Sequence, residues 1–269
     1  MSEIRSRQAR DLAEAALVRL VHAYGGVPEF ILLGGLVPDL LCSRAVLPHV
    51  GTTDVDVQVD LEIQSGMGNT AKLERALIAA GFHPDSERVW RWRDLATPGM
   101  DVKVEFLTDR EDIPAQATVR FNDCDALGAV NLRGTGFAAQ EWELRRMASS
   151  LDGRAISVEL RVAALPGYLL AKIHAAHGRG FPKDWYDVAY VLLHNDQGGP
   201  RPAGRAVAAR FEHALVGSTL TALRELAANF AAPTAQGCLA YSDTMLALHP
   251  DLDGDVIAND ALVSWAGSS

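Results

Sequence analysis

Two aspartates placed two residues apart, Asp54 and Asp56, are of the right type and spacing to bind a metal ion. They belong to residues 54–61, where polar residues alternate with valine or leucine, a pattern typical of a half-buried strand. Their side chains therefore share one face, about 6–7 Å apart along the strand. Because like charges at this spacing repel, we expect a cation between them. Carboxylate oxygens suit Mg²⁺, which also binds substrate phosphates.

A glycine pair, Gly34–Gly35, separates an apolar run at residues 30–33 from a short predicted helix at residues 36–43. Such a strand–turn–helix offers backbone N–H groups without a side chain, which lets a phosphate approach closely. A second alternating segment, residues 100–108, carries Glu105 on its polar face. It supplies a third carboxylate if its strand is a neighbour of the aspartate-bearing strand. Together these features predict metal-assisted phosphoryl or nucleotidyl transfer.

Three sequence stretches resemble known nucleotidyltransferases. The stretches LLGGLVPDLL and GTTDVDVQVD resemble the signature of the nucleotidyltransferase superfamily that shares a polymerase β-like core. The stretch LPGYLLAKIHAAHGRGFPKDWYDVAYVL resembles the C-terminal motif of the AbiEii/AbiGii toxin nucleotidyltransferases. That motif has a lysine on one helix, then a basic turn, and then K-D-x-x-D on the next helix. The matching positions are Lys172, Arg179, Lys183, Asp184 and Asp187. The strand DVKVEFL resembles the one that carries the family's third acid, here Glu105.

The resemblance implies a toxin-like nucleotidyltransferase that depends on Mg²⁺, or on Mn²⁺ in its place. An acceptor hydroxyl attacks the α-phosphorus of a nucleoside triphosphate, and pyrophosphate leaves. The implied metal ligands are Asp54, Asp56 and Glu105, and the implied catalytic set adds Lys172 and Asp187. The implied nucleotide-binding residues are Gly34, Gly35, Thr53, Lys172, Arg179 and Lys183.

The resemblance also implies partners. In some members of the family the acceptor is the 3′ end of transfer RNA, and its modification stops translation. The implied partners of this chain are therefore a nucleoside triphosphate, a transfer RNA bound through a local basic patch, and a cognate antitoxin.

Two alternatives to this activity stay open. Leu36 follows the glycine pair where the family commonly has Ser or Thr, and the third acid is Glu where Asp is usual. The missing hydroxyl, which Thr52 or Thr53 would have to replace, favours a catalytically silent nucleotide- or partner-binding module. The acidic chain instead favours transfer to a small cationic acceptor, such as an aminoglycoside-like antibiotic.

Several of these residues also have structural interpretations. Lys172, on an apolar helix, is of a type that often extends toward solvent, and Asp184 can stabilise a helix N-terminus. Residues 88–93 alternate arginine with valine or tryptophan, which favours buried tryptophans with arginines in water, with stacked RNA bases as the alternative. His174 and His177 lack a third ligand and are expected on a helix surface.

Composition limits the class of protein. The 269 residues include 25 basic and 34 acidic side chains, a net charge of −9, so nucleic-acid binding would need a local basic patch. Three distant cysteines form neither a disulfide framework nor a zinc motif, which predicts a reducing, cytoplasmic location. The N-terminus lacks the apolar core of a signal peptide, and no apolar run reaches the length of a membrane span, so we expect no membrane partner.

Strand and helix signals alternate up to residue 163, and helical patterns alone follow. We therefore expect an α/β (α+β) nucleotidyltransferase core with a mixed sheet at residues 1–163, and a C-terminal helical domain at residues 164–269. The second domain is expected to complete the active-site cleft. The predicted elements include helices at 7–24, 69–80, 168–177 and 183–194, a hairpin at 89–108, a strand pair and a helix within 119–147, and a strand at 156–162.

Overall fold

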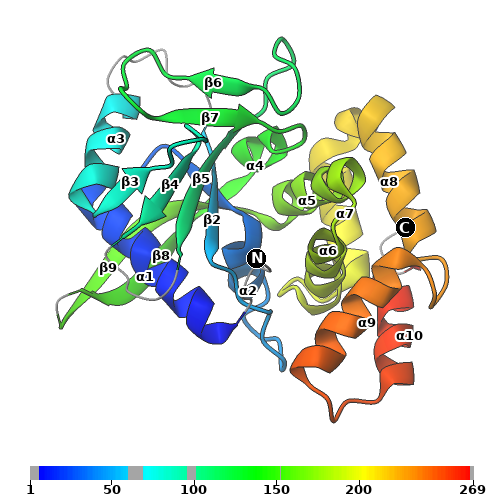
Figure 1. Cartoon of the computed structure of the whole chain (residues 1–269). Helices are drawn as coiled ribbons and strands as arrows, with labels where there is room; N and C mark the ends of the chain where they lie inside the picture. Colours follow the sequence, from blue (N-terminus) through cyan, green and yellow to red (C-terminus); the bar gives the residue numbers. More distant parts are fainter. Residues whose placement is uncertain (1–5, 60–68, 96–100, 152, 267–269) are drawn as a thin grey trace. The chain divides into compact units, whose positions relative to one another are not determined.

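The computed structural model describes residues 6–59, 69–95, 101–151 and 153–266 (Figure 1). Its contacts divide the chain into two units. The first unit consists of Met1–Val37 and Val50–Ala163, and the second of Pro38–His49 and Ala164–Ser269. The sequence analysis placed all of residues 1–163 in one domain. The structure differs from that expectation, because Pro38–His49 belongs to the second unit.

A nine-stranded mixed sheet forms the core of the first unit (Figure 1). Its main path is β3 (Phe82–Pro84), β4 (Arg91–Asp94), β5 (Lys103–Thr108), β2 (Asp54–Gln58), β1 (Ile31–Leu33), β9 (Arg154–Ala163) and β8 (Trp142–Leu151). A branch joins β7 (Gly128–Asn131) to β5 and β6 (Thr118–Arg120) to β7. Strand β2 is parallel to β5 and antiparallel to β1, so the strand that carries the two aspartates lies inside the sheet.

The helices of the first unit pack on this sheet. Helix α1 (Arg7–Tyr24) contacts β2, β8, β9 and α3 (Asn69–Ala79). It begins where the Ala9 N–H donates to Ser6 Oγ at 3.1 Å, and it ends at Gly25, whose φ of 72° suits glycine. Short helical turns at η1 (Gly34–Leu36) and α4 (Gly136–Gln140) complete the unit.

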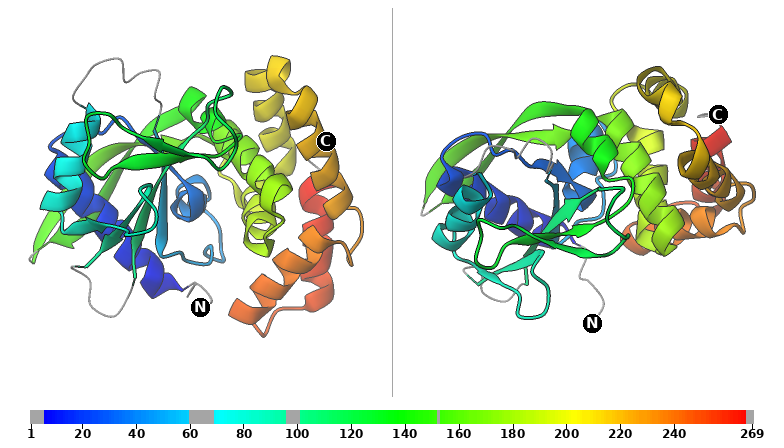
Figure 2. Two further views of the ribbon diagram at one scale, coloured as in Figure 1. Left: turned by 45° about the horizontal axis from the view of Figure 1, so that its top comes forward. Right: turned by 90° about the horizontal axis from the view of Figure 1, so that it is seen from above.

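Six helices and one short turn form most of the second unit. They are α5 (Leu165–Arg179), α6 (Pro182–His194), α7 (Pro200–Phe211), η3 (Glu212–Ala214), α8 (Gly217–Asn229), α9 (Gln236–Leu248) and α10 (Gly254–Ala266). Helix α5 contacts α6, α7 and α8, while α6 contacts α9 and α10. Both views of Figure 2 show α9 and α10 side by side. The two motif-bearing helices, α5 and α6, are therefore surrounded by their neighbours.

Hydrogen bonds explain why Pro38–His49 belongs to the helical unit. This segment holds most of the short helix α2 (Val37–Leu41). The Tyr190 hydroxyl donates to the Leu47 carbonyl at 2.8 Å, and the Ser43 hydroxyl donates to the Asp196 carboxylate at 2.7 Å. These partners are more than 140 residues away along the chain, which is why sequence patterns did not reveal the association.

The mixed α/β class and the helical C-terminal half are confirmed. Helix α1 has the predicted bounds, and β4 and β5 form the predicted hairpin. The connection of this hairpin, residues 96–100, lies outside the described residues. Strand β8 was not predicted, because it is an edge strand and most of its side chains are exposed, which leaves no apolar alternation to recognise. No helix in the described ranges is both long and apolar enough to cross a membrane.

We predict that the ion pair between Arg19 of α1 and Asp94 of β4 stabilises the first unit. Arg19 Nη2 lies 2.6 Å from Asp94 Oδ1, and the Asp94 side chain is fully buried. Arg19→Met should lower the free energy of unfolding by about 3 kcal/mol, because it removes a partner from a buried charge. The matched control, Arg146→Met, breaks an exposed pair with Glu159 and should change it by less than about 0.5 kcal/mol. Equal losses in urea unfolding would contradict this.

Candidate functional site

The three predicted metal ligands lie on one face of two neighbouring strands. The parallel register of β2 and β5 pairs Asp54 with Lys103 and Asp56 with Glu105. All four side chains are half-buried, whereas the intervening valines and phenylalanine are buried on the other face. The condition set by the sequence, that the two strands be neighbours, is therefore met. We call Asp54, Asp56 and Glu105 the carboxylate row.

Two basic side chains pair with this row. Lys103 Nζ lies 3.6 Å from Asp54 Oδ1, and Arg91 of β4 donates from Nε to Glu105 Oε1 at 2.6 Å. In the part of the chain that the structure describes, no three His, Cys, Asp or Glu side chains are grouped so that they could hold a metal ion. The structure thus brings Glu105 beside Asp56 in register, but its carboxylate is bound by Arg91.

Strand β4 places tryptophan and arginine on opposite faces, as its alternation favoured, but Trp90, just before the strand, is only half-buried. Trp92 is buried at 1% exposure, while Arg91 and Arg93 lie on the opposite face. Arg93 donates to Asp101 at 2.5 Å and to Asp85 at 2.8 Å, and these hydrogen bonds raise the pKa of its guanidinium. Both arginines thus bind carboxylates.

The glycine pair lies directly against the carboxylate row. Gly34 has a φ of 75°, and a Cβ at this position would overlap Asp56 Oδ2. A Cβ at Gly35 would lie 2.9 Å from the Cβ of Thr52. Only residues without a side chain allow the Asp56 carboxylate to lie this close to the backbone. Oxygen donors beside a bare backbone turn are surroundings that fit a hard divalent cation with phosphate ligands.

The two threonines before β2 hold the strand in place. The Asp54 N–H donates to Thr52 Oγ1 at 3.1 Å, and the Lys103 N–H donates to the Thr53 carbonyl at 3.1 Å. Both threonines are buried. The Thr52 hydroxyl thus fixes the start of the aspartate-bearing strand, while the role of Thr53 in nucleotide binding stays a prediction.

The helix motif forms a second group of charges, which we call the lysine cluster: Lys172, Arg179, Asp184 and Asp187. Lys172 Nζ lies 2.7 Å from Asp187 Oδ2 and 3.5 Å from Asp184 Oδ1. Arg179 Nη2 donates to Asp184 Oδ1 at 2.9 Å. The Lys172 side chain is 8% exposed and both aspartates are buried, so the interpretation of Lys172 as a lysine that extends into solvent is wrong. Lys183, the remaining motif residue, is half-buried at the start of α6.

Sequence reasoning missed His49, which contacts the lysine cluster through Asp187. Its Nε2 lies 2.9 Å from Asp187 Oδ1, and its side chain is 1% exposed. A histidine 138 residues before its partner gives no spacing signal, so only the tertiary structure identifies it. By contrast, His174 and His177 are half-buried on α5 and bind Thr219 and Glu225 respectively.

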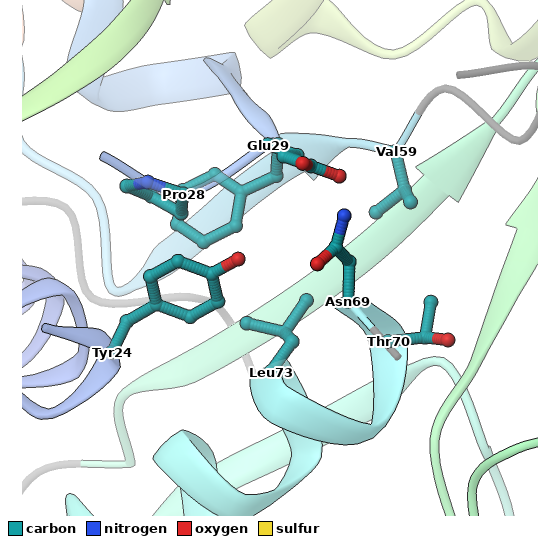
Figure 3. A pocket seen from close by; sticks show the side chains of 8 residues that line it. Tyr24, Pro28, Glu29, Val59, Asn69, Thr70 and Leu73 are labelled. Carbon is teal, nitrogen blue, oxygen red and sulfur yellow. The ribbon is translucent and has the colours of Figure 1, made fainter. Parts of the chain in front are cut away.

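A pocket elsewhere in the first unit contains none of the predicted site residues (Figure 3). Its lining is Tyr24, Pro28, Glu29, Phe30, Val59, Asn69, Thr70 and Leu73. Figure 3 shows the Tyr24 hydroxyl and the Asn69 amide directed into the same space. Burial, and then the charge of Glu29, raise the pKa of Tyr24, so its hydroxyl stays protonated at neutral pH. The pocket is therefore distinct from the carboxylate row.

A family model described as "Nucleotidyl transferase AbiEii toxin, Type IV TA system" matches residues 29–255. The chain belongs to this family. The match covers both the carboxylate row and the lysine cluster, and it extends through most of the C-terminal helices, where no motif was identified from sequence. No curated protein and no solved structure matches the chain. The protein is thus a toxin-like nucleotidyltransferase of the AbiEii family.

We predict that Gly34→Ala will disrupt the carboxylate row beyond its effect on the backbone. The control is Gly153→Ala, because Gly153 has the same φ of 75° but no described atom within 4 Å of an added Cβ. The control should lose about 1 kcal/mol of unfolding free energy from backbone strain alone. Gly34→Ala should lose about 2 kcal/mol more, because Asp56 must move. Equal losses in urea unfolding would show that the contact with Asp56 is unimportant.

Proposed function

We propose that this AbiEii protein transfers a nucleoside monophosphate from a nucleoside triphosphate to an acceptor hydroxyl, and that the acceptor is the 3′ end of transfer RNA. The observation that carries the proposal is the in-register pairing of Asp56 with Glu105 beside the Gly34 turn. Membership of a family described as a type IV toxin–antitoxin system supports a cognate antitoxin as the protein partner.

The carboxylate row would hold Mg²⁺, or Mn²⁺ in its place, which would supply positive charge to the triphosphate. Arg91 and Lys103 bind two of its three acids in this structure. We propose that both side chains turn to phosphate oxygens when the acids bind the ion. The acids would then exchange their basic partners for the ion, and the two bases would exchange the acids for phosphate, so no charge would be left unpaired.

In the proposed reaction, the acceptor hydroxyl loses its proton to water, and its oxygen forms a bond to the α-phosphorus as the bond from that phosphorus to the bridging β-phosphate oxygen breaks. Pyrophosphate leaves with the electron pair. Lys172 would neutralise triphosphate oxygens as a point charge, and Asp187 would hold its ammonium in place. Arg179 and Lys183 would bind further phosphates or the acceptor.

One observation favours a second candidate acceptor. The chain carries a net charge of −9, and an acidic protein attracts a cationic small molecule better than it attracts RNA. An aminoglycoside-like molecule would use the same bond changes at the α-phosphorus. The two candidates differ in how the acceptor is bound, not in the chemistry.

We predict that the purified protein labels transfer RNA when incubated with Mg²⁺ and the correct α-³²P nucleoside triphosphate. Asp54→Asn and Asp56→Asn should each lower kcat by about 100-fold or more. Each removes a charged ligand of the divalent cation that would neutralise the negative charge developing on the phosphate oxygens. Asp112→Asn, at an exposed aspartate, is the matched control and should keep full activity. Label on no acceptor would favour the silent binding module, and label on small molecules alone would favour the second candidate.

We also predict that transfer to RNA is sensitive to salt. If three or more phosphates of the RNA are bound, kcat/KM for transfer RNA should fall by about tenfold or more between 50 and 200 mM salt, because bound counterions are released. The KM for the nucleoside triphosphate, measured in parallel at each salt concentration, corrects for effects on nucleotide binding. A rate independent of salt would contradict an RNA acceptor held by a basic patch.

A further inference from the structure

His49 binds the carboxylate that holds Lys172. The two oxygens of Asp187 have different partners: His49 Nε2 lies 2.9 Å from Oδ1, and Lys172 Nζ lies 2.7 Å from Oδ2. Because an ionised carboxylate only accepts hydrogen bonds, His49 must carry a proton on Nε2 and donate it. Two donors on opposite oxygens fix the rotation of the Asp187 carboxylate.

His49 is itself held on several sides. Its backbone N–H donates to Asp39 Oδ1 at 3.0 Å. The centre of its ring lies 5.1 Å from that of Tyr186 and 4.9 Å from that of Tyr190. The Tyr190 hydroxyl also binds the carbonyl of Leu47, two residues before His49. The imidazole therefore has little freedom to leave Asp187.

We propose that His49 is a positioning residue for nucleotidyl transfer: its hydrogen bond fixes Asp187 in the rotation that holds the Lys172 ammonium ready for the triphosphate. This inference rests on the proposed function, in which Lys172 acts on phosphate. Without the histidine donor, the Asp187 carboxylate can rotate, and the Lys172 ammonium that it binds can then occupy more than one position. A displacement of about 1 Å at a catalytic group is enough to lower a rate strongly.

A positioning role and a merely structural role predict different effects of substitution. If His49 only fills space, any flat ring of similar size serves, and the loss on substitution follows the loss of stability. If its N–H positions Asp187, an amide that reaches the same place restores function although it is not a ring. His49→Phe and His49→Gln separate these roles, since the first keeps the ring and the second keeps a donor.

His194 provides a matched control. It is a half-buried histidine that shares one tyrosine neighbour with His49, since its ring centre lies 4.7 Å from that of Tyr190. Its Nε2 lies 3.2 Å from the Tyr241 hydroxyl rather than against Asp187, and burial lowers its pKa, so the ring is neutral at pH 7. His194→Phe should therefore cost stability without altering the position of Lys172.

The test measures kcat and KM for the nucleoside triphosphate in the full-length protein. His49→Phe should lower kcat/KM by about tenfold or more, as expected for removal of a residue that orients a catalytic group, mainly through kcat. His49→Gln should recover most of this loss, and His194→Phe should retain wild-type kcat/KM. The inference is overturned if His49→Gln is as impaired as His49→Phe, if His49→Phe is fully active, or if His194→Phe is equally impaired.

A second readout does not require activity. The native protein is treated with an amine-acylating reagent, and modification of Lys172 is followed by mass spectrometry. Lys172 should react slowly in the wild type, His49→Gln and His194→Phe, and several times faster in His49→Phe. If the wild type transfers no nucleotide, the proposed function fails, and this labelling still decides whether His49 fixes Lys172. Equal labelling of all four proteins would overturn the inference.

Discussion

Repulsion between Asp54 and Asp56 is the constraint around which the first unit is arranged. Two unit charges about 6–7 Å apart repel by roughly 2–3 kcal/mol at an effective dielectric constant of 20. Lys103, which is paired with Asp54 in register, offsets part of this cost, and Arg91 balances the charge of the neighbouring Glu105. Gly34 adds a backbone that approaches Asp56 without a side chain. Three acids still face two bases, and this excess negative charge is what a divalent cation would balance.

The lysine cluster solves a different electrostatic problem. Its two aspartates are buried, so each needs partners that replace water. Arg179 binds Asp184, while Lys172 and His49 bind Asp187. Because the charges of Lys172 and Arg179 are matched by two carboxylates, this cluster adds little net positive charge. Its contribution is better understood as fixing where the Lys172 ammonium lies, which is why the donor on the far side of Asp187 matters.

The sequence predicted those features that are encoded locally. Alternation of aspartate and valine identified β2 and its acidic face, and helical periodicity bounded by Gly25 identified α1. The motif on α5 and α6 identified Lys172 and Asp187 through resemblance. The partners that complete each cluster were not predictable in this way, because Arg91 reaches Glu105 across a strand pair and His49 reaches Asp187 across 138 residues. The same reason explains why sequence patterns did not associate the segment Pro38–His49 with the helical unit.

The proposed function depends most on the carboxylate row, which we propose binds a divalent cation together with the nucleotide. Binding of Mn²⁺, measured by electron paramagnetic resonance with and without a non-hydrolysable nucleoside triphosphate, tests it directly in the wild type and in Asp56→Asn. We expect the wild type to bind Mn²⁺ more tightly when the nucleotide is present, and Asp56→Asn to lose this gain while remaining folded. Equal Mn²⁺ binding by the two proteins would contradict the assignment of the carboxylate row as the metal site.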